Sequence, residues 1–329
     1  MNNRRGHSRG DLPLWQETAR AFNTAVESGR LDLPLPGSGA TLERLSALAD
    51  LAGDDLSLAR LGEGHADAVA ILAELGGPSP QPGSRWGVWA ANPPGPNVTA
   101  ECRDGTWTLR GTKQYCSGAR ICTHALVTAA AADGQRLFAV HVAELEPGDG
   151  TWPATGMAGS DTLNVGFPGV VADPVGPPDG YTNRPGFSHG GVGVAACWYG
   201  GARGVGRALL SAAAKRDVGP HALAHLGAVD IGLRTAWAAL TAAAREIDAD
   251  PGDLHGDGPL RALRVRTLTE AVATDVLART GRALGAGPLG HDEAHSRAVA
   301  DLTVYLRQHH AERDLARLGE LIAERGAGW

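Results

Sequence analysis

Cysteine is scarce in this chain, and the few cysteines are not arranged as metal ligands. None of their spacings forms a CxxC pair, which argues against a structural zinc site. The charged start of the sequence is not followed by the apolar segment of a signal peptide, so we expect a cytoplasmic protein with reduced thiols. The four cysteines are Cys102, Cys116, Cys122 and Cys197.

Long hydrophobic runs and positive net charge are also missing. The most apolar stretch, 192–210, is interrupted by Arg203 and Arg207, whereas a membrane span needs roughly 20 apolar residues. The net charge of −6 provides no basic field to attract nucleic acid or anionic lipid. With 43% hydrophobic and 20% charged residues, the chain has a globular composition. The sequence therefore predicts neither a nucleic-acid partner nor a membrane partner.

The first two regions of the chain differ in the spacing of their apolar residues. Residues 1–82 are expected to be a helical domain, with helix-like apolar spacing and a helix over 54–75 that is capped near Asp54 or Asp55. Glycine and proline crowd the segment 76–86, which marks a boundary. Residues 83–178 then show short alternating runs between turns, which favour an antiparallel β-sandwich or barrel. The expected strands are 86–91, 106–110, 124–129, 137–142 and 163–167.

The third region, residues 187–329, is rich in alanine and helical throughout. Its long amphipathic segments are separated by glycine or proline, which predicts a C-terminal four-helix bundle. The fold class is therefore α+β, because strands and helices do not alternate as a doubly wound sheet requires. The expected helices of the bundle are 194–214, 223–247, 260–284 and 292–323.

The segment 109–119, LRGTKQYCSGA, carries the first of several resemblances to one family. Together with the order of the three regions, it resembles the acyl-CoA dehydrogenase family, in which a similar hairpin lies beside the flavin ring. The resemblance places Tyr115 where an aromatic residue flanks the flavin and Ser117 where a hydroxyl bonds near its reactive edge. An aromatic ring packs well on a flavin face, and a hydroxyl can donate to the flavin. An ordinary hairpin is the alternative interpretation.

Two further segments resemble the same family. GVWAANPPGP, residues 87–96, matches the position of a strand end whose backbone contacts the flavin, and this implies that Trp89, Ala90 and Ala91 are flavin neighbours. TWPATGMAGSDTLNVGF, residues 151–167, resembles the family's Gly-Met turn before a strand and implies that Ser160 lies at the substrate. A buried strand end and structural packing are the alternative explanations.

The joint RTGRALGAGPLG, residues 279–290, resembles the connection that meets the ADP half of FAD in the family, often from a neighbouring subunit. Gly285 and Gly287 match two of its glycines, which allow close approach to phosphates. Arg282 is placed to pair with the pyrophosphate. The resemblance thus implies FAD as cofactor and a homodimer or homotetramer, although the similarity is weaker over the N-terminal helices, which are shorter than the family's.

Two features depart from the family. The catalytic glutamate is expected eight residues after Asp301, where the chain has His309, and the alternative position near Gly193 has no carboxylate either. Histidine can act as a general base near neutral pH, and Glu312, one helical turn later, is the nearest carboxylate. We therefore expect His309 and Glu312 to be the catalytic pair. The Arg-x-x-Phe pair that reaches the partner's flavin is also missing, since residues 215–218 read KRDV.

Three functions remain open from the sequence. The leading one is an FAD-dependent oxidoreductase that acts on a CH–CH or similarly activated bond of a small acyl-type substrate. The missing glutamate favours a flavin-dependent monooxygenase as the alternative. The missing Arg-x-x-Phe pair favours a non-catalytic binding or assembly module. His221 and His225 have metal-ligand spacing but no third ligand, so no metal site is expected.

Overall fold

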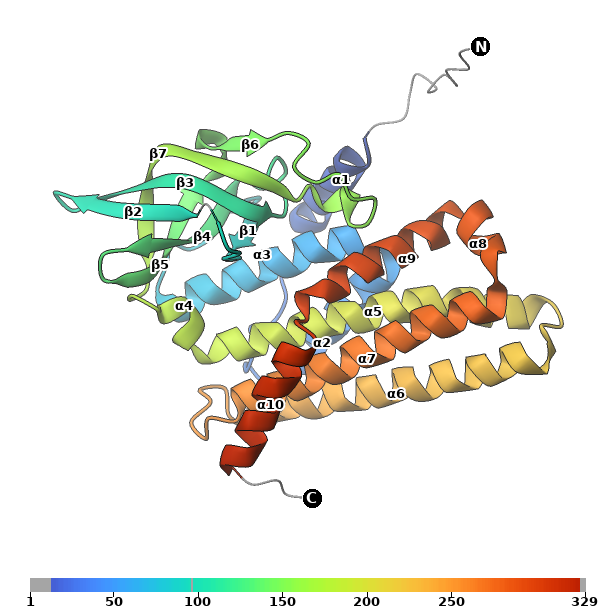
Figure 1. Ribbon diagram of the computed structural model, residues 1–329. Helices are drawn as coiled ribbons and strands as arrows, with labels where there is room; N and C mark the ends of the chain where they lie inside the picture. The colour runs from blue at the N-terminus through green and yellow to red at the C-terminus, as the bar shows by residue number, and fades with distance from the viewer. Residues whose placement is uncertain (1–12, 96, 326–329) are drawn as a thin grey trace, which may run out of the picture.

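The computed structural model describes residues 13–95 and 97–325. A small β-barrel lies against one end of a bundle of long helices, and α3 runs beneath the barrel (Figure 1). Among the described residues, no helix combines the length and the apolar character that a membrane crossing requires.

The N-terminal region forms three helices, as the sequence predicts. The Asp55 side chain accepts a hydrogen bond from Leu58 N at 2.9 Å and caps α3, which confirms the expected cap. α3 is buried on almost every side because it packs against the barrel, α2 and α5. Gly76, which has a φ of 68°, ends this helix. The three helices are α1 (Leu14–Glu27), α2 (Thr41–Asp54) and α3 (Leu56–Leu75).

The β region is a barrel, one of the two expected forms, and it is not a sandwich. The ring runs β4, β2, β3, β7, β5 and back to β4. The expectation of an antiparallel sheet was wrong in part, because β1 and β2 both pair with β4 in parallel. The strands are β1 (Trp86–Trp89), β2 (Val98–Arg103), β3 (Thr106–Cys116), β4 (His124–Ala131), β5 (Gly134–His141), β6 (Glu146–Gly148) and β7 (Leu163–Val175), with short 3-10 turns η1 (Val142–Glu144) and η2 (Ala158–Ser160).

Three long helices of the C-terminal region agree with the sequence, whereas the fourth is broken. The interruption at residues 306–311 arises because side chains there bind the backbone: Ala311 N donates to His309 Nδ1 at 3.2 Å and His310 N to Asp314 at 3.0 Å. The helices are α4 (Gly180–Asn183), α5 (Pro185–Lys215), α6 (Gly219–Ala249), α7 (Gly258–Leu284), α8 (Ala286–His291), α9 (Glu293–Tyr305), η3 (Leu306–Gln308) and α10 (Glu312–Arg325).

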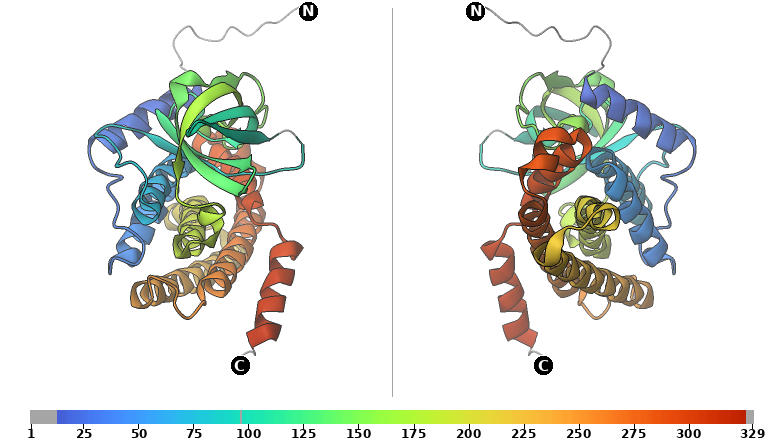
Figure 2. Two further views of the ribbon diagram at one scale, coloured as in Figure 1. Left: turned by 90° about the vertical axis from the view of Figure 1, so that its left-hand side faces the viewer. Right: turned by 90° about the vertical axis from the view of Figure 1, so that its right-hand side faces the viewer.

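The broken helix changes the shape of this end of the molecule. α10 packs on α7 and stands apart from the rest of the bundle in both side views (Figure 2). The N-terminal and C-terminal helices form one continuous bundle, since α5 packs against α2 and α3 as well as against α6, α7 and α9. The order of the elements matches the expected regions, and their division into domains 1–82, 83–178 and 187–329 stays a prediction.

Candidate functional site

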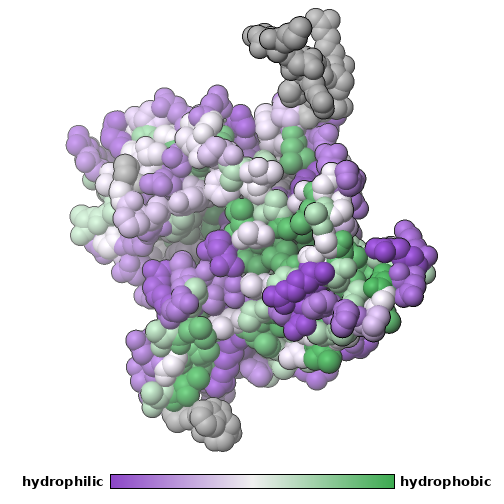
Figure 3. Space-filling model, turned by 45° about the vertical axis from the view of Figure 1, so that its right-hand side comes forward, coloured by the Kyte–Doolittle hydropathy of each residue, from purple (hydrophilic) through white to green (hydrophobic). Residues whose placement is uncertain are grey.

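A cavity of about 1410 Å³ lies between the barrel, α3, the start of α5, α7 and the α9–α10 connection. On the face that Figure 3 shows, hydrophobic side chains gather in the middle of the molecule, between the barrel and the bundle. The cavity walls contain both apolar and charged side chains. It therefore has the size and mixed lining of a site for a large organic ligand.

Tyr115 presents its ring to the cavity from the end of β3. The pairing between β3 and β7 shifts in register between Lys113 and Cys116, and Tyr115 has a φ of 59° at this irregularity. Its side chain is 50% exposed and meets the Trp152 ring edge-on, with centroids 6.4 Å apart. An irregular strand end thus turns an aromatic ring out of the barrel and into the cavity.

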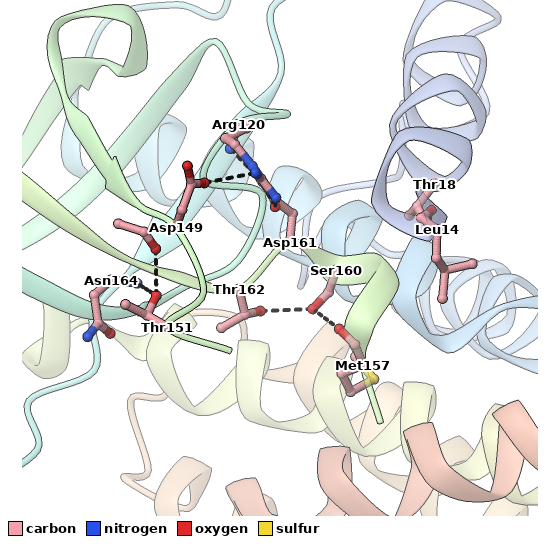
Figure 4. A network of polar contacts seen from close by, with 11 residues as sticks. Leu14, Thr18, Arg120, Asp149, Thr151, Met157, Ser160, Asp161, Thr162 and Asn164 are labelled. Atoms are coloured by element: carbon pink, nitrogen blue, oxygen red, sulfur yellow. Dashed lines mark hydrogen bonds and ion pairs between the residues drawn. The ribbon is translucent and has the colours of Figure 1, made fainter. Parts of the chain in front are cut away.

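Three hydroxyl groups lie together on the barrel wall of the cavity. Ser117 Oγ is 2.9 Å and Ser160 Oγ is 2.8 Å from Thr162 Oγ1, and Ser160 also donates to Met157 O at 2.7 Å. Figure 4 shows Ser160 and Thr162 pointing toward one another. The adjacent turn is held by Asp161, which accepts from Arg120 N at 2.7 Å. These hydroxyls can bond to the polar edge of a ligand.

Lys113 supports the barrel wall of the cavity from the interior of the barrel, a role that was not predicted from the sequence. The side chain is fully buried, and its Nζ donates to Asn92 Oδ1 at 2.8 Å and to Thr128 O at 2.9 Å. Burial lowers the pKa of Lys113 to about 8. Since Asn92 and Thr128 line the cavity, Lys113 positions the loop after β1. Its place in the segment LRGTKQYCSGA was a signal that could have identified it.

The inner wall of the cavity is charged, and this was not predicted from the sequence either. Arg60 and Glu63 of α3 form an ion pair of 2.6 Å, and Asp67 follows one turn later. Arg184 pairs with Glu74 at 2.7 Å. Burial raises the pKa of the Glu63 carboxyl. These residues lie on α3 and before α5, and only the packing of the two helices brings them together.

Five of the residues expected at the cofactor and substrate lie together on the cavity wall. Trp89 is expected there as well, but its side chain is only 1% exposed and lies behind the wall. Its indole N–H donates to Ser117 O at 2.9 Å, so Trp89 positions Ser117 and does not reach the cavity. The five residues that line the cavity are Ala90, Ala91, Tyr115, Ser117 and Ser160.

The structure does not place the expected catalytic pair in the cavity. His309 is buried, its Nε2 lies 3.0 Å from Thr267 Oγ1, and its Nδ1 accepts from a backbone N–H. Burial lowers the pKa of His309. Glu312 is exposed and does not line the cavity, whereas His310 and Asp314 do. The expected arrangement assumed a continuous helix where the chain breaks, and the catalytic roles of His309 and Glu312 stay a prediction.

The glycine joint lies at the opposite end of the bundle. Arg282, Gly285 and Gly287 are at the end of α7 and the start of α8 and do not line the cavity. At about 1.5 Å per residue, Arg282 is roughly 24 Å along α7 from Arg266, which does line it. These residues therefore cannot touch a ligand in this chain's own cavity. Within the described residues, no group of three or more histidine, cysteine or acidic side chains is placed to hold a metal.

Six arginines line the cavity, and most of them are paired with carboxylates. Four of them, Arg60, Arg184, Arg307 and Arg317, form ion pairs with Glu63, Glu74, Glu270 and Glu320. Arg266 and Arg313 form no ion pair among the described residues, so these two can meet an anionic group. The arginines are Arg60, Arg184, Arg266, Arg307, Arg313 and Arg317, and the carboxylates that also line the cavity are Glu63, Asp67 and Asp314.

Comparison with known proteins identifies the fold. No protein-family model and no curated protein matches the chain. The nitrososynthase from Micromonospora carbonacea var. africana aligns with a TM-score of 0.76 and 20% identity over 95% of this chain and 93% of that chain. The dibenzothiophene monooxygenase TdsC from Paenibacillus sp. A11-2, in complex with FMN and indole, aligns with a TM-score of 0.73 and 19% identity over 95% and 96%.

A third solved structure gives the same result. The methanesulfinate monooxygenase MsuC from Pseudomonas fluorescens aligns with a TM-score of 0.73 and 16% identity over 96% of this chain and 97% of that chain. Similarity at this level of identity shows the fold and leaves the activity to be argued from the site. The chain therefore has the acyl-CoA dehydrogenase-like fold, with a β-barrel between helical regions, that these enzymes share.

Proposed function

We propose that this chain is a flavin-dependent monooxygenase that acts on a small organic molecule. The observation that carries the proposal is the convergence of two barrel segments on one cavity: Ala90 and Ala91 after β1, with Tyr115 and Ser117 at the end of β3. These segments are the ones whose sequences resemble flavin-contacting segments. A bound flavin would supply two-electron oxidation and reduction, and the protein would supply its binding and orientation.

The residues present fit a flavin. Tyr115 offers a half-exposed ring for packing against the isoalloxazine, and the hydroxyls of Ser117, Ser160 and Thr162 offer donors to its polar edge. Arg266 and Arg313, which line the cavity and form no ion pair among the described residues, suit a phosphate group. The cavity of about 1410 Å³ also leaves room for a substrate beside the cofactor.

FMN fits this single chain better than the FAD that the sequence implied. The expected contacts to the ADP half, Arg282, Gly285 and Gly287, lie far from the cavity, so they would serve a flavin only in a neighbouring copy. The crystallised monooxygenase TdsC holds FMN. Binding of FAD through a homodimer or homotetramer is the alternative, and a comparison of the affinities for FMN and FAD distinguishes the two.

The proton-accepting groups favour oxygenation over acyl-CoA dehydrogenation. The positions where the dehydrogenase base is expected hold His309, which is turned away from the cavity, and Gly193. Three similar structures are named as a nitrososynthase and two monooxygenases. Dehydrogenation of an acyl-type substrate stays a second candidate because of one carboxylate, Glu63, which lines the cavity and whose pKa is raised by burial.

The cofactor is tested first by adding FMN, FAD and riboflavin to the purified protein and following flavin fluorescence. We expect FMN to bind in the micromolar range. The double variant Arg313→Ala, Arg317→Ala should weaken FMN several-fold but leave riboflavin unaffected, because the arginines would meet only the phosphate. Arg325→Ala, on the same helix but outside the cavity, is the matched control.

The reaction is tested with reduced FMN, candidate substrates and isotopically labelled oxygen. Incorporation of one labelled oxygen atom into a product supports a monooxygenase. Reduction of the flavin by an acyl-CoA, without uptake of oxygen into the product, would support the dehydrogenase instead. A protein that binds none of the three flavins would reject both activities and favour the non-catalytic binding module.

A further inference from the structure

One arginine of the cavity wall carries a charge that no adjacent carboxylate balances. Arg266 of α7 is partly buried and lines the cavity, and it forms no ion pair among the described residues. Glu63 and Asp314 act on it only from a distance. Glu63 is paired with Arg60 at 2.6 Å, and Asp314 lies 3.3 Å from His310 Nδ1. A charge that is withdrawn from water normally has a partner of opposite sign, and Arg266 lacks one.

The protein holds this guanidinium in place with neutral groups. It lies over the Trp198 ring, with its central carbon 4.6 Å from the ring centroid. Its Nη1 donates to Gly191 O at 3.4 Å and its Nη2 donates to Gln308 O at 3.1 Å. These contacts from α5 and η3 fix the orientation of the side chain without neutralising its charge. A ligand would therefore meet a preorganised cation.

One edge of the guanidinium is open. Nε of Arg266 makes no hydrogen bond with the described residues and, unlike Arg184 Nε, is not buried. Gly191, which lines the cavity next to Arg266, has no side chain to cover this edge. Contact with a ring occupies the face of a guanidinium and leaves its N–H edges available, and such an edge matches the two oxygens of a carboxylate.

The cavity wall on either side of this cation is apolar. Leu263 lies one helical turn before Arg266 on α7 and lines the cavity. On α5, Phe187 and Val194 line it one turn before and one turn after Gly191. These side chains offer surface to a hydrocarbon and no partner to a neutral polar group. The wall therefore combines a single cation with apolar surroundings.

We propose that Arg266 anchors the substrate through an oxyanion, and that the substrate is a small organic acid with an apolar body. The acid group accepts from the open edge of the guanidinium, and the hydrocarbon part lies along Leu263, Phe187 and Val194. A neutral acyl chain at this wall would leave the cation without a partner. The inference rests on the proposed function, because it assigns the barrel side of the cavity to the flavin and Arg313 to the phosphate of FMN.

The test compares benzoate with benzamide, which has the same shape but no charge, by isothermal titration of FMN-loaded protein. We expect benzoate to bind more tightly by about tenfold or more, since charge-assisted hydrogen bonds are the stronger ones. Benzenesulfonate is the third probe. Its binding alongside benzoate identifies negative charge as the feature that is recognised, whereas binding of benzoate alone identifies the planar carboxylate; both results support an oxyanion site.

Variants of Arg266 separate an anchor from a structural role. Arg266→Gln should weaken benzoate by about tenfold or more and leave benzamide within about twofold, so that the preference of the wild type disappears. A merely structural role would weaken both probes together. Arg266→Lys keeps the charge without the two-donor edge, should give an intermediate loss, and serves if the glutamine variant fails to fold. Arg264→Gln, at an exposed arginine of the same helix outside the cavity, is the matched control and should change nothing.

FMN affinity separates this site from the flavin site, and it should stay the same in Arg266→Gln. A loss of FMN binding but not of riboflavin binding in that variant would overturn the inference, because Arg266 would then hold the flavin phosphate. Equal binding of benzoate and benzamide, binding of neither, or an equal loss of both in Arg266→Gln would overturn it too. A wild-type protein that binds no flavin would instead reject the proposed function, and the same titrations without flavin then judge Arg266 by itself.

Discussion

The Nζ atom of Lys113, buried in the barrel, lies 2.8 Å from Oδ1 of Asn92, on the loop that faces the cavity. The same ammonium group donates to Thr128 O and Thr128 Oγ1, both at 2.9 Å. One buried cation thus links the interior of the barrel to two residues of the cavity wall. A buried charge is tolerated only when it is bonded in this way.

Replacement of Lys113 by methionine should destabilise the protein. The variant keeps the length of the side chain but leaves buried oxygens without a donor, and each such group costs about 1–3 kcal/mol. We expect a loss of about 3 kcal/mol in the free energy of unfolding, measured by urea denaturation. Lys215→Met is the control, since Lys215 is exposed and is the other lysine of the chain. Equal stability of the two variants would contradict the role of Lys113.

Tyr115 should affect flavin binding without affecting the stability of the fold. Its ring is half-exposed in the cavity, so Tyr115→Ala removes an aromatic contact worth about 0.5–1.5 kcal/mol. We expect FMN affinity to fall up to about tenfold by fluorescence titration. Tyr115→Phe keeps the ring and should stay within about twofold of wild type. A similar loss in both variants would show that the hydroxyl, and not the ring, binds the flavin.

Asp301 should make the stability of the protein depend on pH. It is buried, and its carboxylate accepts from Met157 N at 2.5 Å. Burial raises the pKa of Asp301 to about 6 from its ordinary value of 3.8. Between about pH 4 and about pH 6, the folded chain keeps a proton on Asp301 that the unfolded chain has released. The contribution of Asp301 to stability is therefore present below about pH 4 and is lost as the pH rises through about 6.

The variant Asp301→Asn removes this titration and keeps an oxygen that can accept from Met157 N. We expect it to be more stable than wild type at pH 7, by about 1–3 kcal/mol, and similar to wild type at pH 4. Melting temperatures across this pH range measure the difference. Asp50→Asn, on the surface, should show no such trend. A difference between variant and wild type that is the same at both pH values would rule out the titration of Asp301.

Gly200 and Gly281 should respond in opposite directions to replacement by alanine. A Cβ atom at Gly200 of α5 would lie 2.1 Å from Ala49 O of α2, so Gly200→Ala should separate the two helices. A cost of about 2–3 kcal/mol in the free energy of unfolding is expected. At Gly281 of α7 no atom lies within 4 Å, and Gly281→Ala should stabilise the helix by about 0.5–1 kcal/mol. Thermal denaturation of both variants tests the close packing of α2 and α5.

The segment around Tyr115 shows how far local sequence determined the site. LRGTKQYCSGA and GVWAANPPGP identified most of one cavity wall, because the residues that share this wall are also neighbours along two strands. The expected backbone contact of Trp89 with the flavin stays a prediction, and the sequence did not show that its side chain is buried, because strand alternation does not say which face meets a cavity and which meets the core. Its burial depends on packing inside the barrel.

In the helical regions too, the sequence predicted the local elements but not the contacts between them. Apolar periodicity and glycine or proline breaks fixed the order of helices, barrel and bundle, since these signals act within a few turns of chain. The break before α10 could not be predicted from apolar periodicity, because it depends on the His309 and Asp314 side chains, which accept hydrogen bonds from nearby backbone N–H groups. Because these side-chain bonds replace the helical hydrogen bonds of the backbone, His310 lines the cavity and His309 does not.

By itself, then, the sequence determined the three regions and the barrel wall of the cavity, whose signals lie close together along the chain. Tertiary structure alone decided the inner wall, where Asp67 of α3, Arg184 and Tyr305 meet although they are far apart in sequence. The physical reason is that periodicity reports which side of a helix is covered, but not which distant side chain covers it. The charge of this wall follows from that meeting.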